Sequence, residues 1–168
     1  FYQRKEIKDV LAYFRLAINQ SDEEALKRII NYPARGIGNT TVNKIQECSR
    51  LNGVSMTTIM EDPLRFNLNV NSGTSAKLIA FRKLIDDFGL FIREEDAYRA
   101  ADKIIKQTGI IEEIYKDKSV ENISKQENIQ ELLSGIHEFV ESKLEEGETG
   151  ISLADFLTEV SLLTDQDT

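Results

Sequence analysis

The residues best suited to chemistry lie in one run, Pro33-Ala34-Arg35-Gly36-Ile37-Gly38-Asn39-Thr40-Thr41. Its two glycines let the backbone turn tightly and expose N–H groups, because glycine has no Cβ to restrict the conformation or block an approaching group. A helix pattern follows, and the positive end of a helix dipole attracts anions. The Gly-Ile-Gly turn (residues 36–38) therefore predicts a site for a phosphate group.

Backbone and side chains share this predicted site. The glycines admit a phosphate, the isoleucine anchors the turn in the core, and the N–H groups of residues 38–41 point at a phosphate oxygen. A threonine hydroxyl donates a further hydrogen bond. An arginine and a lysine supply positive charge, which attracts any phosphate and does not distinguish one base sequence from another. The predicted site comprises Arg35, Gly36, Ile37, Gly38, Asn39, Thr40, Thr41 and Lys44. The alternative is a plain glycine-rich connector between antiparallel helices.

Charge is spread unevenly along the 168 residues, whose net charge is −8. Residues 1–50 hold nine Lys and Arg against six acids, whereas the rest holds 12 against 23. Because whole-protein charge hides local patches, only the N-terminal third suits a polyanion. We expect a basic part over residues 1–53 and an acidic part over residues 54–168. The alternative is that these charges are ordinary solvated helix faces.

The sequence argues against catalysis and against a membrane protein. It has no Gly-x-x-x-x-Gly-Lys-[Ser/Thr] phosphate loop, so we expect no ATP hydrolysis by this chain. A single cysteine, Cys48, and a single histidine, His137, offer no metal cluster and no catalytic triad. No apolar run approaches the roughly 18 residues that a membrane span needs, and the opening residues do not show the charged-then-apolar pattern expected of a leader. We therefore expect a cytoplasmic chain without a cofactor of its own.

Helical spacing of apolar residues begins at Ile7 and predicts an all-α domain. A first helix covers residues 7–18, and Ser21 with Glu24 has the form of a capping box that starts a second. Asn39 or Thr40 caps a third helix. Gly53 ends that helix, since glycine favours the C-terminal stop.

The remaining pattern is also helical. Residues 61–75 are predicted to be an irregular connection, and helical spacing resumes over residues 78–88, 97–105 and 129–140. Ser152 and Asp155 form a second capping box, which starts a last helix. The expected fold is a compact multi-helix domain with a helix-hairpin-helix-like turn.

These motifs carry a family resemblance. The opening Phe1-Tyr2-Gln3-Arg4-Lys5-Glu6-Ile7-Lys8-Asp9-Val10-Leu11-Ala12-Tyr13-Phe14-Arg15-Leu16 resembles the block just past the fourth helicase motif of UvrD, Rep and PcrA type DNA helicases of superfamily 1. Further blocks fall in the same order as in that family: Asp22-Glu23-Glu24-Ala25, Arg28-Ile29-Ile30-Asn31, the run from Pro33 to Thr41, Asn128-Ile129-Gln130-Glu131-Leu132 and Leu153-Ala154-Asp155-Phe156-Leu157.

The resemblance implies that residues 1–168 are the 2B subdomain, an all-helical module inserted into the second RecA-like motor domain of such a helicase. It implies a non-catalytic module that grips the backbone of duplex DNA near a single-strand junction and swivels relative to the motor domains. The parent would be an ATP-dependent 3′ to 5′ helicase, which needs ATP and Mg²⁺ in its motor domains. The alternative is a protein-interaction module that recruits a DNA repair or transcription partner.

Overall fold

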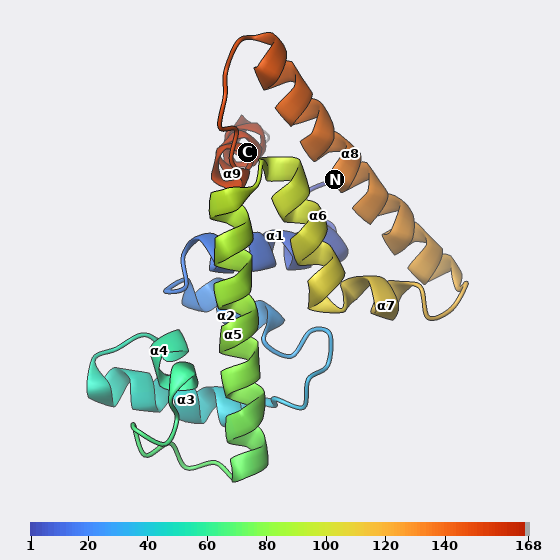
Figure 1. The fold of residues 1–168 in the computed structure, drawn as a ribbon. Coiled ribbons are helices and arrows are strands. Elements are labelled where there is room, and N and C mark those ends of the chain that lie inside the picture. The colour runs from blue at the N-terminus through green and yellow to red at the C-terminus, as the bar shows by residue number, and fades with distance from the viewer. Residues whose placement is uncertain (167–168) are drawn as a thin grey trace.

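A computed structural model of the chain describes residues 1–166, which fold into α-helices without a strand (Figure 1). The all-α prediction is therefore confirmed for the described residues. In chain order the helices are α1 (Lys5–Ile18), α2 (Glu23–Ile29), α3 (Asn39–Asn52), α4 (Met56–Glu61), α5 (Ser72–Glu94), α6 (Ala97–Thr108), α7 (Ile110–Ile114), α8 (Val120–Glu145) and α9 (Leu153–Gln166).

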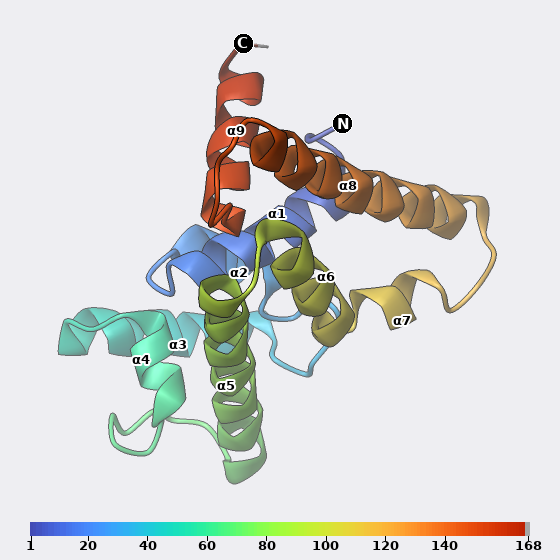
Figure 2. The ribbon, with the colours of Figure 1, turned by 45° about the horizontal axis from the view of Figure 1, so that its top comes forward.

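Helix α1 forms the centre of the core. It packs against α2, α5, α6, α8 and α9, so that apolar side chains are needed on most of its faces (Figure 2). Tyr13 and Phe14, which are neighbours in sequence and point in different directions, are both fully buried. A helix covered on one side only would bury a single stripe. The sequence pattern predicts that stripe. The side chains buried outside the stripe are covered by the surrounding helices.

The molecule has two ends, joined by the long helix α5. Helices α3 and α4 lie beside the first half of α5 at one end, whereas α6, α8 and α9 gather at the other (Figures 1 and 2). The Gly-Ile-Gly turn leads into α3 and so belongs to the first end. None of the described helices is long and apolar enough to cross a membrane.

Two predicted helix starts are wrong. Helix α2 is capped by Asp22, whose carboxylate accepts a hydrogen bond from the Ala25 N–H at 3.0 Å, and not by Ser21. Helix α3 already includes Asn39 as its first residue, so Gly38 occupies the capping position. In both cases several neighbouring residues are acceptable caps, and the path of the incoming chain selects one.

Other boundary predictions are confirmed. Gly53 ends α3 in the left-handed conformation, with φ +63°. Ser152 and Asp155 exchange hydrogen bonds of 2.9 and 3.1 Å as a capping box before α9. The connection predicted over residues 61–75 is shorter, since α4 extends to Glu61 and α5 begins at Ser72. The short helices α4 and α7 were not predicted, because five or six residues are too few to show a helical period.

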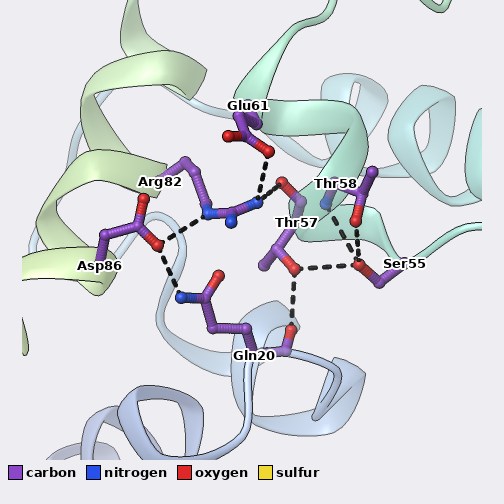
Figure 3. Close-up of polar contacts among 7 residues, drawn as sticks. All are labelled: Gln20, Ser55, Thr57, Thr58, Glu61, Arg82 and Asp86. Atoms are coloured by element: carbon purple, nitrogen blue, oxygen red, sulfur yellow. Dashed lines mark hydrogen bonds and ion pairs between the residues drawn. The ribbon is translucent and has the colours of Figure 1, made fainter. Parts of the chain in front are cut away.

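A polar network attaches α4 to α5 and to the loop after α1 (Figure 3). The Arg82 guanidinium donates to the Thr57 carbonyl at 2.7 Å and to the Asp86 carboxylate at 3.0 Å. The Gln20 amide donates to the same Asp86 oxygen at 2.7 Å, and the Thr57 hydroxyl donates to the Gln20 carbonyl at 3.0 Å. This network holds α4 against α5. It thereby helps to position α5, whose Lys77 lies beside the Gly-Ile-Gly turn.

An ion pair between Asp9 and Arg28 joins α1 to α2. Asp9 on α1 is 4% exposed, and its carboxylate accepts a hydrogen bond from Arg28 at 2.8 Å. Burial raises the pKa of Asp9 above its ordinary value, and the nearby Arg28 guanidinium opposes that rise without cancelling it. The ionised carboxylate is therefore tolerated because Arg28 accompanies it.

This pair predicts unequal effects of removing its two members. At pH 7 we expect Arg28→Met to lower the free energy of unfolding by about 3 kcal/mol, because it leaves a buried carboxylate unpaired. We expect Asp9→Asn to lower it by only about 1 kcal/mol. The penalty in Arg28→Met exists above the raised pKa of Asp9 and is relieved as the pH falls through that pKa. Urea unfolding at a series of pH values from 7 down to 4 should show the deficit of Arg28→Met against wild type shrinking as the pH falls, and a deficit that stays constant over this range would contradict the assignment.

Candidate nucleic-acid interface

The Gly-Ile-Gly turn is held in shape by the side chain of Asn31. Its carboxamide oxygen accepts hydrogen bonds from the backbone N–H groups of Arg35 at 2.8 Å and Ile37 at 3.2 Å. Gly36, between them, has φ +76°, a conformation that favours glycine. Ile37 is 1% exposed, which confirms that it anchors the turn in the core. The turn is thus preformed, with its outer face open to solvent.

The start of α3 is the open part of this face. Gly38 occupies the capping position with extended backbone angles and has no side chain to cap the helix. Side chains do cap α2, α4, α5, α6 and α8, through Asp22, Ser55, Asn71, Asp96 and Ser119. The first N–H groups of α3, over residues 39–41, therefore have no side-chain cap from Gly38 and carry the positive end of the helix dipole.

Most of the residues predicted from the sequence gather at this helix start. Gly36, Gly38, Asn39 and Thr40 are exposed, and Thr41 is half-buried. Lys44 lies about one turn further along α3, where its Nζ donates to the Asn69 carbonyl at 2.9 Å. The structure thus brings backbone donors, hydroxyl groups and one lysine to one small surface.

Arg35 does not join them, because its guanidinium points into the molecule. One nitrogen, Nη1, donates to the carbonyl oxygens of Ile29 at 3.0 Å, Ile30 at 3.3 Å and Tyr32 at 3.1 Å. The other, Nη2, donates to the Thr108 carbonyl at 2.9 Å. These carbonyls lie at the ends of α2 and α6, where a helix leaves acceptors without internal partners.

The hydroxyl group of Tyr13 completes this arrangement. It accepts a hydrogen bond from Nη2 of Arg35 and donates one to the Tyr32 carbonyl. Burial raises the pKa of Tyr13 to about 12, although the nearby guanidinium acts in the opposite direction. Tyr13 therefore keeps its proton at neutral pH and remains a donor. The guanidinium also lies 4.9 Å from the centre of the Phe81 ring on α5, within cation–π range.

These contacts change the role expected for Arg35. A guanidinium with four carbonyl partners and a phenol is not placed to meet a phosphate outside the turn. We therefore assign Arg35 a positioning role, in which it holds the turn against α1, α5 and α6. The sequence suggested a phosphate contact because a basic residue beside two glycines does not reveal which way its side chain points.

The structure places a different cation beside the turn, Lys77 on α5. A Cβ built on Gly36 would lie 2.6 Å from Nζ of Lys77 and 3.4 Å from its Cε. The side chain is exposed and comes from a segment 41 positions further along the chain. No spacing rule links residues 36 and 77, so the sequence pattern does not indicate this lysine as a neighbour of the turn. The sequence feature that points to Lys77 is the lack of acidic residues on either side of it, between Asp62 and Asp86.

Within residues 1–166, no group of three or more His, Cys, Asp or Glu side chains is placed to hold a metal ion. The arrangement at the turn is instead one of backbone N–H groups, hydroxyl groups and ammonium groups. These are donors and cations, and together they suit an oxyanion held by its oxygens.

Comparisons with known proteins agree with the sequence resemblance. The family described as UvrD-like helicase C-terminal domain matches residues 1–168. The chain is 34% identical over 171 residues to the ATP-dependent DNA helicase PcrA of Staphylococcus epidermidis, covering 99% of this chain and 22% of the relative. It is 32% identical over 162 residues to DNA helicase II of Haemophilus influenzae, covering 96% of this chain and 22% of the relative. The chain thus spans about a fifth of the length of these relatives.

The position of Arg35 generates a stability prediction. We expect Arg35→Ala to lower the free energy of unfolding by about 3 to 5 kcal/mol, because four carbonyl groups and the Tyr13 hydroxyl each lose a hydrogen bond at once. Arg35→Lys should recover little, since one ammonium cannot span the partners of a planar guanidinium. Urea unfolding measures both variants.

Urea unfolding together with the duplex affinity of the same variant separates the two roles considered for Arg35. A variant that loses DNA binding and stability together supports the positioning role. Unchanged unfolding of Arg35→Ala with a specific loss of DNA binding would restore the phosphate contact predicted from the sequence.

Proposed function

The chain belongs to the UvrD-like helicase C-terminal domain family, and from that premise we propose that it is a 2B subdomain that binds duplex DNA without catalysing a reaction itself. The observation that carries this proposal is the uncapped start of α3 beside the Gly-Ile-Gly turn. A phosphate of the DNA backbone would accept hydrogen bonds from the N–H groups of residues 39–41. Thr40 or Thr41 would add a hydroxyl donor, and Lys44 a positive charge.

This chemistry defines the binding mode. The donors address phosphate oxygens, which are the same at every base pair, so binding is indifferent to sequence. Each neutralised phosphate releases counterions, so affinity falls as salt rises. The net charge of −8 opposes association at long range, which keeps the binding weak.

We further propose that the parent is an ATP-dependent 3′ to 5′ DNA helicase of the cytoplasm, since the relatives are named as helicases and the chain covers 22% of their length. ATP and Mg²⁺ would bind to the motor domains of that parent. Residues 1–168 would be a single insertion that swivels relative to the motor domains. Duplex DNA near a single-strand junction would bias that motion to the extent that it binds one orientation better than the other.

A second candidate function is the capture of a DNA repair or transcription protein by the helices after residue 75. The observation that favours it is a set of exposed apolar side chains on α8 and α9, at Val120, Leu144, Leu162 and Leu163. Acidic residues are frequent on the same helices, so a basic partner would suit them. This candidate requires nothing of the Gly-Ile-Gly turn.

Gly38→Val tests the duplex-binding proposal. Gly38 has φ −84°, and a Cβ there would meet no other heavy atom within 4 Å, so the variant should fold with a change in unfolding free energy below about 1 kcal/mol. Its side chain would nevertheless stand where the phosphate must approach. We expect at least about a tenfold loss of affinity for a labelled duplex with a 3′ single-stranded tail, measured by fluorescence anisotropy at low salt.

Wild type and a surface variant on another part of the molecule, Lys143→Gln, serve as controls. Lys143 lies in the last turn of α8 and pairs with Glu146 and Glu148. The end of α8 lies at the opposite end of the molecule from α3, so this substitution should leave duplex affinity nearly unchanged (Figure 1). If folded wild type fails to bind the duplex at low salt, the proposal is wrong and partner capture becomes the better explanation. If Gly38→Val binds as well as wild type, the turn is a connector only.

A further inference from the structure

Acidic residues are nearly absent from a long central part of this acidic chain. Residues 25–85 contain only Glu47, Glu61 and Asp62, so 26 of the 29 acids lie elsewhere. The same residues contain nine basic side chains: Lys27, Arg28, Arg35, Lys44, Arg50, Arg65, Lys77, Arg82 and Lys83. This segment runs from the middle of α2 to the middle of α5. The basic region therefore extends well past residue 53, where the sequence pattern suggested a division.

The fold gathers this segment at one end of the molecule. Helices α3 and α4 and the first half of α5 form that end in both views (Figures 1 and 2). Nζ of Lys44 on α3 donates to the carbonyl of Asn69, just before α5. Lys77 on α5 covers Gly36. The start of α3 and the early turns of α5 are thus parts of one surface.

The basic side chains of this surface differ in their hydrogen-bond and ion-pair partners. Arg35 and Arg82 are held by internal partners. Lys83 pairs with Asp87 at 3.4 Å, one helical turn away. For Lys77, by contrast, no hydrogen bond or ion pair is present among residues 1–166. Its ammonium is an uncompensated charge directly beside the preformed turn.

We propose that Lys77 binds the backbone phosphate of duplex DNA held at the start of α3, in the place that the sequence assigned to Arg35. The inference rests on the proposed function and adds to it a residue from a different helix. A lysine is a point charge with three rotatable donors, so it can follow a phosphate without a fixed geometry. Lys77 and the α3 N–H groups would then hold one phosphate from two sides.

The proposal also gives a second reason for glycine at position 36, in addition to its positive φ. Any side chain there would begin 2.6 Å from Nζ of Lys77 and would push the ammonium away from the turn. A lysine that only covered the turn could move aside, because its end is flexible and exposed. A lysine that shares a phosphate with the turn must stay close to it.

The test compares Lys77→Gln with Lys83→Gln, a variant of the same helix that removes the same charge. Both side chains are exposed, so both variants should unfold in urea like wild type. At low salt we expect Lys77→Gln to lower the affinity for the tailed duplex about tenfold and Lys83→Gln to lower it less than about twofold. The slope of log affinity against log salt should fall by about 0.9 for Lys77→Gln alone, the value for one phosphate contact.

A second measurement places the contact on the DNA. Duplexes that each carry one neutral methylphosphonate should show a position at which Lys77→Gln loses less affinity than wild type. The variant has no ammonium to pair with that phosphate, so only the contribution of the α3 N–H groups is lost there. Equal effects of Lys77→Gln and Lys83→Gln, with additive losses at every methylphosphonate, would overturn the role of Lys77.

The outcomes also separate this inference from the proposed function. If Gly38→Val weakens binding but Lys77→Gln behaves like Lys83→Gln, duplex binding stands and the role of Lys77 is wrong. If folded wild type does not bind the duplex, both are wrong.

Discussion

The guanidinium of Arg35 joins four parts of the chain, the helices α1, α2, α5 and α6. Helix ends leave carbonyl groups without partners, and two such ends, those of α2 and α6, meet beside Tyr13 in the core. A single planar group with several donors satisfies both ends and packs on the ring of Phe81 at the same time. Four parts of the chain are therefore positioned by one side chain. The turn that follows Arg35 inherits its position from that arrangement.

This internal attachment leaves the outer face of the turn free for another molecule. Asn31 fixes the backbone from one side and Ile37 from beneath, so the N–H groups at the start of α3 need no rearrangement to accept a ligand. Preorganisation of this kind reduces the entropy lost on binding. A stiff turn would also give the proposed, sequence-indifferent contact with DNA a defined orientation.

Charged groups near the core have ion-pair partners, whereas a positive charge on the surface beside the turn has none among the described residues. Ionic groups in or near the core have partners on other helices: Asp9 on α1 pairs with Arg28 on α2, and Arg82 on α5 pairs with Glu61 on α4. Lys77, which lies by the turn, has none among the described residues. Because most acids lie outside residues 25–85, the positive surface persists in a protein of net charge −8. An approaching polyanion is therefore attracted to one end of the molecule and repelled from the other.

The helical fold class, most helix positions, the stop at Gly53 and the glycine turn can be predicted from the sequence, because each of these depends on residues close together in the chain. It also carried the family resemblance. Helix packing sets three features that the sequence does not indicate: Arg35 points inward, Gly38 leaves α3 without a side-chain cap, and Lys77 lies over Gly36. The physical reason is that side-chain direction and long-range neighbours depend on how helices pack, and no local period or spacing encodes a contact between residues 36 and 77.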